Sequence, residues 1–220
     1  PVNYYKDEVV IPEGVKKIAE AAFISCHIKS VKFPDSLDLI EDRAFFCCDE
    51  LESIDFGNSI FSIGGMYSES AFSYCKSLKQ VTLPPQIKDI GERAFFGCNN
   101  LDNIVIPNQV TSIGKQAFFH CISLSNITIS ASVSYIDDTA FSNTDNLKTI
   151  YGIPGSYAET FAKENGYEFL DVNTKGVFQI EDGVLIKYLG DGGDVVVPDG
   201  ITKIADKAFE NCANVTSVVL

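Results

Sequence analysis

The sequence is short of positive charge, and this shortage excludes two classes of partner. Its 220 residues include 17 Lys and Arg against 30 Asp and Glu, which gives a formal net charge of −13 at pH 7. Nucleic acids and anionic membrane surfaces are bound through cationic side chains, so we expect neither as a partner. The chain also lacks an apolar run near the roughly 20 residues that cross a bilayer, so we expect no direct membrane insertion of this segment.

Signals for catalysis, cofactors and metals are also scarce. The two histidines, His27 and His120, lie on distant copies of the repeat described below, so they cannot share one metal ion. The Asp191–Asp194 segment lacks the ligand spacing of a calcium loop, and we interpret it as a turn. Because no phosphate-binding loop or dinucleotide motif is present either, we expect no catalytic, cofactor-binding or metal-binding residue.

The start of the sequence carries no secretory signal peptide. Residues 1–5 have neither the charged nor the apolar part of a secretory signal peptide. If the protein is exported, its signal has been removed or lies outside this sequence. Because the chain stops at Leu220, inside a predicted strand, we expect it to be a fragment of a longer protein.

What the sequence does contain is an internal repeat of about 23 residues. An Ala-Phe pair recurs along the chain, and a Cys follows three residues after most of these Phe residues. Thr144 stands in place of the Cys in one copy. The phenylalanines are Phe23, Phe45, Phe72, Phe95, Phe118, Phe141 and Phe209, and the cysteines are Cys26, Cys48, Cys75, Cys98, Cys121 and Cys212.

Each repeat predicts one short strand and one shared core. Apolar and polar residues alternate in segments such as Val81–Leu83, which is typical of a strand with one buried face, and Pro84 then ends the strand. A unit of this length cannot enclose a core alone, so neighbouring units must stack and share one. We therefore predict a β-rich repeat solenoid in which equal repeat positions form columns of Phe, Cys and Leu.

The same alternation identifies the side chains that face outward from the predicted sheet. They are mostly small and polar, and they include one Tyr but no Trp or Arg, the residues that dominate protein interfaces. This face could hydrogen-bond a glycan or an extended peptide, or it could simply face solvent. Our candidate ligand residues here are Lys32, Asp55, Gln80, Thr82, Asn103, Val105, Asn126, Thr128 and Tyr151.

An insertion before Ala71 offers a second candidate contact site. The chain between Ile60 and Ala71 is longer than in the neighbouring repeats, and insertions in solenoids map to loops, often on a binding face. Met66 and Tyr67 are its candidate ligand residues. The alternative is a tolerated surface insertion, because lengthening a loop costs little free energy.

The repeated cysteines are expected to be buried free thiols. They sit between apolar columns, where parallel side chains suit packing better than disulfide geometry. Cys47, beside Cys48, lies off this column and is the one candidate for an exposed thiol. We align Cys47 with Phe96 and Phe119, which favours a half-buried apolar role for it.

The repeat is interrupted between Phe141 and Phe209, where other signals occur. Residues 156–159 read as a capping box, which predicts a helix over residues 157–165. An Asp-Gly pair at 182–183 between apolar runs predicts a β-hairpin.

These signals divide the chain into three parts. Residues 1–151 form a repeat array of about six units, and residues 152–176 form a helix-containing cap or junction. Residues 177–220 contain the hairpin and the start of a second array, because residues 195–204 match residues 9–18 in pattern.

The repeat unit, Leu-x-x-Val-x-Leu-Pro followed by Ile-Gly-x-x-Ala-Phe-x-x-Cys, resembles the BspA-like leucine-rich repeat, also called leucine-rich repeat class 5. The resemblance covers about residues 9–151 and 195–220, and residues 152–166 resemble a segment that often closes such arrays. It implies a right-handed leucine-rich-repeat solenoid in a bacterial protein of the cell surface or the extracellular space. The family has no catalytic residues to carry over.

The resemblance implies a non-enzymatic module that acts by adhesion or binding. We expect it to engage an extracellular protein or glycan through its solenoid surface. The alternative is a structural spacer, a segment of a larger surface protein with no ligand of its own.

Overall fold

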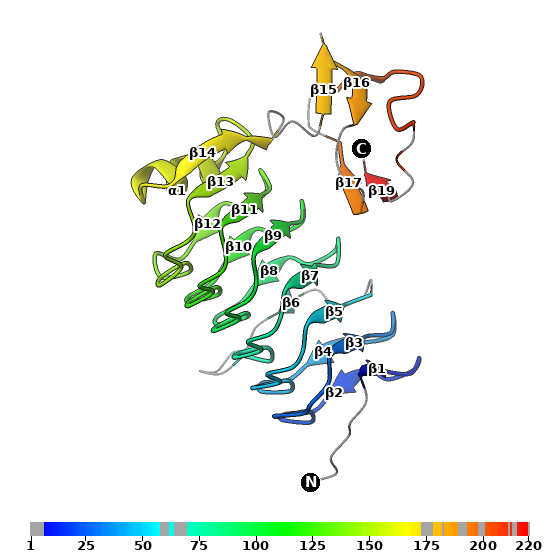
Figure 1. Ribbon diagram of the computed structural model, residues 1–220, viewed down its shortest axis with the longest axis vertical. Helices are drawn as coiled ribbons and strands as arrows, with labels where there is room; N and C mark the ends of the chain where they lie inside the picture. Colours follow the sequence, from blue (N-terminus) through cyan, green and yellow to red (C-terminus); the bar gives the residue numbers. More distant parts are fainter. Residues whose placement is uncertain are drawn as a thin grey trace. The chain divides into compact units, whose positions relative to one another are not determined.

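The computed structural model describes residues 7–57, 62–63, 70–172, 178–181, 183–188, 193–197, 201–210, 212 and 215–219. These residues belong to two compact units, Pro1–Phe169 and Leu170–Leu220. Figure 1 shows the strands of both units and the single short helix of the described chain.

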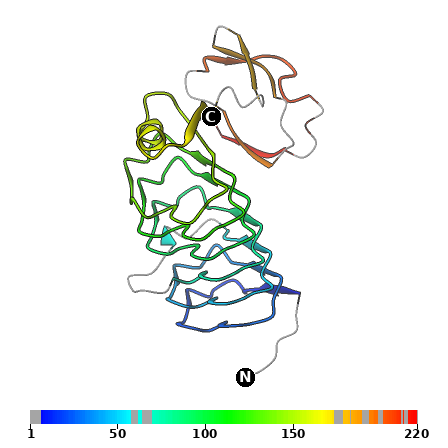
Figure 2. The ribbon, with the colours of Figure 1, turned by 60° about the vertical axis from the view of Figure 1, so that its left-hand side comes forward.

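The first unit is a β-solenoid, as predicted, with its coils stacked one above another (Figure 2). Each coil contributes one strand to a main sheet, and most coils add a two-residue strand that belongs to a second sheet on another side of the solenoid. The main strands are β1 (Glu8–Val10), β3 (Ser30–Lys32), β5 (Ser53–Asp55), β7 (Gln80–Thr82), β9 (Asn103–Ile106), β11 (Asn126–Ile129) and β13 (Thr149–Gly152). The short strands are β2 (Lys17–Ile18), β4 (Leu39–Ile40), β6 (Ser62–Ile63), β8 (Asp89–Ile90), β10 (Ser112–Ile113) and β12 (Tyr135–Ile136).

Strand pairing keeps equal repeat positions in line. The main strands pair in parallel with the orders β1-β3-β5-β7 and β9-β11-β13, and β14 (Glu168–Asp171) lies at the outer edge of the second group. In one ladder Val31 pairs with Ile54, and Ile54 pairs with Val81. Because a parallel ladder pairs residues one coil apart, inward and outward side chains form continuous columns.

The core of the first unit contains a ladder of stacked phenylalanine rings, which confirms the predicted Phe column. Ring centroids lie 6.3 Å apart for Phe72 and Phe95, and 5.5 Å apart for Phe95 and Phe118. The rings of Phe118 and Phe141 follow at 5.5 Å. Phe161 of α1 (Tyr157–Glu164) meets the Phe141 ring edge-on at 5.9 Å, so the helix closes this column.

The helix forms within one residue of its predicted range, but the predicted capping box does not form. Glu159 Oε2 accepts a hydrogen bond from the Gly155 N–H at 2.7 Å, not from the Ser156 N–H. The Ser156 N–H is already engaged, because it donates to the Ile153 carbonyl at 3.1 Å. The Ser156 side chain makes no capping hydrogen bond to the helix.

The turn of each coil uses a residue with positive φ two positions after the Phe. These residues are Ser25, Cys47, Tyr74, Gly97, His120 and Asn143, with φ between 55° and 70°. Cys47 therefore shares its position with Gly97 and His120, and our alignment of Cys47 with Phe96 and Phe119 was wrong by one residue. The thiol is half-buried.

The glycine of the repeated Ile-Gly pair permits a close approach between coils. The Gly114 N–H donates to the Ile90 carbonyl at 2.7 Å, and a Cβ on Gly114 would lie 2.9 Å from the Glu92 nitrogen.

We expect Gly114→Ala to lower the free energy of unfolding by about 1–3 kcal/mol, measured by urea denaturation. The exposed neighbour provides the control, since Lys115→Ala should change stability by less than about 0.5 kcal/mol. Equal losses in both variants would contradict the close approach.

The second unit contains the predicted hairpin. Strands β15 (Phe178–Glu181) and β16 (Val184–Tyr188) pair antiparallel, and Gly183 in their turn has a φ of 74°. β16 also pairs in parallel with β18 (Lys203–Ile204). Leu185, Val197 and Ala208 form a small buried cluster in this unit.

One expectation in the second unit was wrong in part. Gly193 and Asp194, which we interpreted as part of a turn, belong to β17 (Gly193–Val196), which pairs with β19 (Val215–Val219). The strand begins before Val195 because Asp194 also pairs with β19, opposite Ser217. Asp191 and Gly192 lie outside the described residues. The division of the chain at residues 151 and 176 remains a prediction.

Candidate binding surface

The structure places the candidate sheet residues on the outer face of the main sheet. Thr128 of β11 pairs with Val105 of β9 on one side and with Tyr151 of β13 on the other. Val105 is 53 % exposed. The exposed candidates are Lys32, Asp55, Gln80, Thr82, Asn103 and Val105, and the half-buried ones are Asn126, Thr128 and Tyr151.

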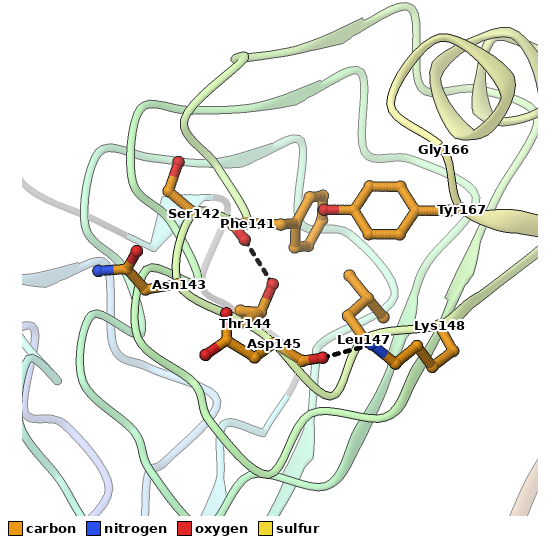
Figure 3. A pocket seen from close by; sticks show the side chains of 9 residues that line it. All are labelled: Phe141, Ser142, Asn143, Thr144, Asp145, Leu147, Lys148, Gly166 and Tyr167. Atoms are coloured by element: carbon orange, nitrogen blue, oxygen red, sulfur yellow. Dashed lines mark hydrogen bonds between the residues drawn. The ribbon is translucent and has the colours of Figure 1, made fainter.

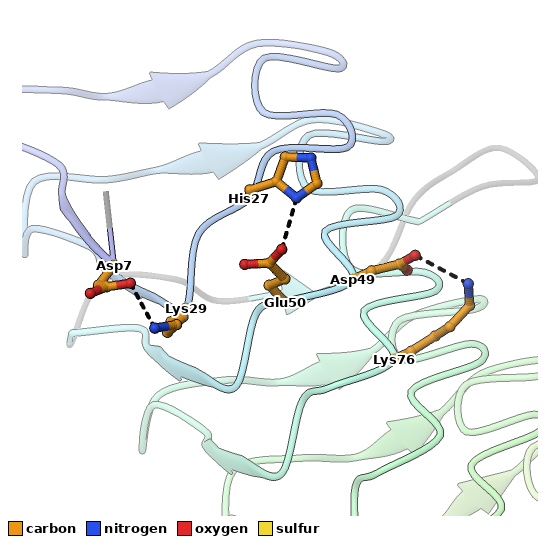
Figure 4. A network of polar contacts seen from close by, with 6 residues as sticks. All are labelled: Asp7, His27, Lys29, Asp49, Glu50 and Lys76. Carbon is orange, nitrogen blue, oxygen red and sulfur yellow. Dashed lines mark hydrogen bonds and ion pairs between the residues drawn. The ribbon is translucent and has the colours of Figure 1, made fainter. Parts of the chain in front are cut away.

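In the N-terminal half of the solenoid, ion pairs connect surface side chains of neighbouring coils. On the sheet face, Lys32 Nζ lies 3.4 Å from Asp55 Oδ2. Figure 4 shows two further ion pairs, between Lys29 and Asp7 and between Lys76 and Asp49, with N···O distances of 2.8 and 3.2 Å. It also shows a hydrogen bond of 3.0 Å between His27 Nδ1 and Glu50 Oε1. These exposed pairs contribute little stability, but they leave much of the local charge neutralised.

The half of the face formed by β9, β11 and β13 is different, because its outward side chains are uncharged. Asn103, Asn126 and Thr149 form one column and carry amide and hydroxyl groups. The Asn126 amide nitrogen donates to Ser125 Oγ at 3.1 Å, and Thr149 Oγ1 donates to Glu168 Oε2 at 3.1 Å. Carboxylates border this half, because the Asn103 amide nitrogen donates to Asp102 Oδ1 at 2.6 Å, but the outward side chains of the three strands themselves carry no charge.

The insertion cannot be assessed from the fold. Met66 and Tyr67, our other candidate ligand residues, lie outside the described residues. Their role remains a prediction.

The column cysteines are free thiols, as expected, but Cys26 and Cys212 are half-buried and not buried as predicted. The buried ones also make hydrogen bonds. Cys48, Cys75, Cys98 and Cys121 are buried, and each thiol donates to the carbonyl of the Phe in the preceding coil. The four Sγ···O distances are 3.0, 3.2, 3.4 and 3.1 Å in that order. Burial raises the pKa of the Cys48 and Cys121 thiols to about 12, so these thiols are poor nucleophiles at neutral pH.

A shallow recess of about 420 Å³ lies at the end of the first array (Figure 3). It is lined by Phe141, Ser142, Asn143, Thr144, Asp145, Leu147, Lys148, Gly166 and Tyr167. Lys148 Nζ donates to the Asp145 carbonyl at 2.6 Å, and the Thr144 hydroxyl donates to the Phe141 carbonyl. Burial raises the pKa of Tyr167 above its ordinary value, so its hydroxyl stays protonated at neutral pH.

The lining of this recess contains neither a His nor a Cys, and its Lys148 ammonium and Thr144 hydroxyl both donate to backbone carbonyls. Sequence reasoning missed it, since it forms only where the helix brings Tyr167 over the last turn. The one signal was the replacement of the repeated Cys by Thr144. Within the described residues there is also no group of three His, Cys, Asp or Glu side chains suited to a metal ion.

The described residues include no helix that is both long enough and apolar enough to cross a bilayer.

No curated protein sequence matches the chain. A family model described as the BspA type leucine rich repeat region matches it in six copies, over residues 3–68, 66–163 and 191–220.

Several solved structures resemble the chain. A leucine rich cell surface protein from Faecalibacterium prausnitzii is 33 % identical, with a TM-score of 0.47 over 70 % of this chain and 34 % of that one. A leucine-rich repeat protein from Bacteroides ovatus is 22 % identical, with a TM-score of 0.48 over 96 % of this chain and 56 % of that one. The leucine rich repeat protein of T. pallidum is 21 % identical, with a TM-score of 0.44 over 97 % and 69 %.

The chain thus spans 34 % of the length of the Faecalibacterium protein and 56 % of that of the Bacteroides protein. The match to the repeat family is broader, since it covers most of the chain in both units. The Ala-Phe turns, the buried Cys column and the parallel ladders are the structural counterparts of that repeat. The chain belongs to the BspA-type leucine-rich repeat family.

Proposed function

We propose that this chain works outside the cell as a non-enzymatic binding module whose main sheet engages an extracellular protein or glycan. The observation that carries the proposal is the outer face of β9, β11 and β13. There, uncharged side chains from three coils stand in register, with the half-buried Thr128 between Val105 and Tyr151. An extended ligand could meet an equivalent group once per coil, at intervals of about 4.8 Å.

The chemistry of this face supports a polar ligand. Asn103 and Asn126 present amide groups in one column, and Val105 and Tyr151 present apolar surface in the next. Amides with an adjacent aromatic ring suit the hydroxyl groups and the apolar faces of sugars, and they suit an extended peptide equally well. The candidate residues of the charged half, from Lys32 to Thr82, would lie at the periphery of such a contact.

The location and the absence of catalysis are parts of the same proposal. Repeats of this family serve typically as interaction modules, and the Faecalibacterium relative is described as a cell surface protein. The buried Cys121 thiol, whose pKa burial raises to about 12, is a poor nucleophile at neutral pH, which agrees with a binding role. The second candidate is a structural spacer, which the ion pairs across the charged half favour, because they leave few groups available to a ligand.

A matched pair of substitutions tests the proposal. Thr128→Arg places a long charged side chain in the middle of the uncharged face, whereas Thr160→Arg places the same side chain on the exposed surface of α1. Binding to immobilised matrix proteins, mucins and neutral glycans is measured by surface plasmon resonance at physiological salt. We expect saturable binding that Thr128→Arg weakens at least about tenfold, or about 1.4 kcal/mol, and that Thr160→Arg leaves unchanged.

Two other results would count against the proposal. Binding that survives both substitutions would move the site away from the sheet face. No binding at high micromolar concentration of any panel member would favour the spacer.

A further inference from the structure

A second row of aromatic rings runs along the outside of the turns of the first unit. We call Phe46, Tyr74, Phe96 and Phe119 the aromatic ridge. Successive ring centroids lie 5.5, 5.1 and 4.7 Å apart. Tyr74 is 36 % exposed and the three Phe rings are half-buried, in contrast to the fully buried Phe ladder of the core. Ile24, at the repeat position of Phe46 and 39 % exposed, extends this apolar strip into the first coil.

The aromatic ridge already holds two cations. Arg43 and Arg93 are the only arginines in the sequence. The Arg43 guanidinium lies 5.3 Å from the centre of the Phe46 ring, and the Arg93 guanidinium lies 5.4 Å from that of Phe96. At these distances the negative face of an aromatic ring attracts a cation. The ridge is therefore built to accept guanidinium groups on its rings.

Two coils of the aromatic ridge lack such an arginine. The residue before the Ala-Phe pair is Arg in the coils of Phe46 and Phe96, but it is Ser70 in the coil of Tyr74 and Gln116 in that of Phe119. Ser70 is buried, and Gln116 Oε1 accepts a hydrogen bond from Arg93 Nε at 2.8 Å. Neither Ser70 nor Gln116 carries a positive charge that could repeat the contact of Arg43 or Arg93 with a ring.

Acidic and basic side chains both flank the aromatic ridge. Glu20, Asp42 and Glu92 occupy one repeat position, two residues before the Ala of their Ala-Phe pairs, and Lys115 occupies the same position in the coil of Phe119. Glu92 is paired with Arg93, with 4.0 Å between Oε1 and Nε. Burial raises the pKa of Asp42, and the charges of Glu20 and Glu41 add to this rise. The net charge of −13 on the whole chain attracts cationic partners and repels anionic ones.

We propose that the aromatic ridge docks a basic protein segment, with Lys or Arg side chains of the partner over the rings of Tyr74 and Phe119. These side chains would repeat the contacts that Arg43 and Arg93 make with Phe46 and Phe96. The exposed apolar surface of Ile24 would contact aliphatic side chains of the same segment, which a small polyamine would not provide. Tyr and Arg are also the residues that dominate protein interfaces, and the sheet face has one Tyr and no Arg.

The first experiment measures peptide binding by fluorescence anisotropy. The probe is a labelled peptide of alternating Arg and Leu, compared with the same peptide carrying Glu in place of Arg. We expect the full chain to bind the Arg peptide, with affinity falling as salt rises, and not the Glu peptide. In the double variant with Tyr74→Leu and Phe119→Leu, binding should weaken about fivefold, because leucine keeps the apolar bulk but removes the ring face.

Matched controls separate this surface from general acidity and from the sheet face. Tyr135→Leu removes a Tyr that is 52 % exposed on β12, away from the aromatic ridge, and should leave peptide binding unchanged. Thr128→Arg should also leave it unchanged, so the two proposals can fail independently. Far-UV circular dichroism checks that each variant folds. If the double variant does not fold, the single Phe119→Leu variant takes its place in the binding measurement.

Three results would overturn the proposal. The first is that the chain does not bind the Arg peptide, and the second is that it binds the Glu peptide equally well. The third is that Tyr135→Leu weakens binding of the Arg peptide as much as the double variant does.

Discussion

Phe95→Ala is expected to lower the free energy of unfolding by about 3–5 kcal/mol. The Phe95 side chain is fully buried and lies between the rings of Phe72 and Phe118. The surrounding coils cannot close the cavity, because the Phe95 N–H is held to the Ala117 carbonyl at 2.8 Å and neighbouring turns are linked in the same way. The cost therefore includes both the lost burial and the cavity that remains.

Urea denaturation of the full chain, followed by far-UV circular dichroism, measures this loss. Thr82→Ala is the control, since Thr82 is exposed on the sheet face and its loss should change stability by less than about 0.5 kcal/mol. Phe95→Leu should fall between the two variants, because it fills part of the cavity. Equal small losses for Phe95→Ala and Thr82→Ala would show that the Phe column does not carry the core.

Raising the pH above 9 is expected to destabilise the protein steeply, because of the buried thiols. An unfolded Cys has a pKa of 9.0, whereas burial raises the pKa of Cys48 and Cys121 to about 12 and those of Cys75 and Cys98 well above 9.0. Above pH 9 the unfolded chain loses these protons while the folded chain keeps them. The stability that the protonated thiols provide is therefore complete below pH 9 and is lost as the pH rises toward 12.

The size of this effect follows from proton linkage. Each buried thiol should cost about 1.4 kcal/mol of stability per pH unit between its unfolded and folded pKa, so four thiols should together cost about 5 kcal/mol per unit. Urea denaturation at pH 8, 9, 10 and 11 in the presence of reductant measures the slope. A double variant, Cys48→Ala with Cys121→Ala, should show about half of the wild-type slope. If its slope equals that of the wild type, the titration of lysines and tyrosines accounts for the alkaline loss instead.

Much of the solenoid could be predicted because its coils repeat one local structure. The Ala-Phe spacing predicted the ring ladder, since equal positions must stack when a short unit shares its core with its neighbours. The alternation in strands such as Asn126–Ile129 predicted which side chains face outward. The Asp-Gly pair predicted the hairpin, because Gly183 adopts the positive φ that its turn requires.

Features that depend on very short or unusual backbone segments were missed. The second strand of each coil is two residues long, as in Ser112–Ile113, which is too short to show alternation. Non-glycine residues such as Cys47 and His120 hold a positive φ in the turns, so no residue type marked that position. The misalignment of Cys47 was a separate error of counting, because Cys47 and Gly97 both lie two residues after the Phe of their coils in the sequence itself.

For the candidate surfaces too, some features follow from the sequence and others only from the tertiary structure. The sequence by itself determined the repeat, the buried Phe and Cys columns and the outward sheet residues, because each depends on periodicity along one chain. Only the tertiary structure decided that the Phe46 ring meets the Tyr74 ring, that Cys98 donates to the Phe72 carbonyl, and that Tyr167 covers the last turn. Such contacts join residues that are close in space but far apart in sequence, so they depend on how coils and helix pack, which no local pattern encodes.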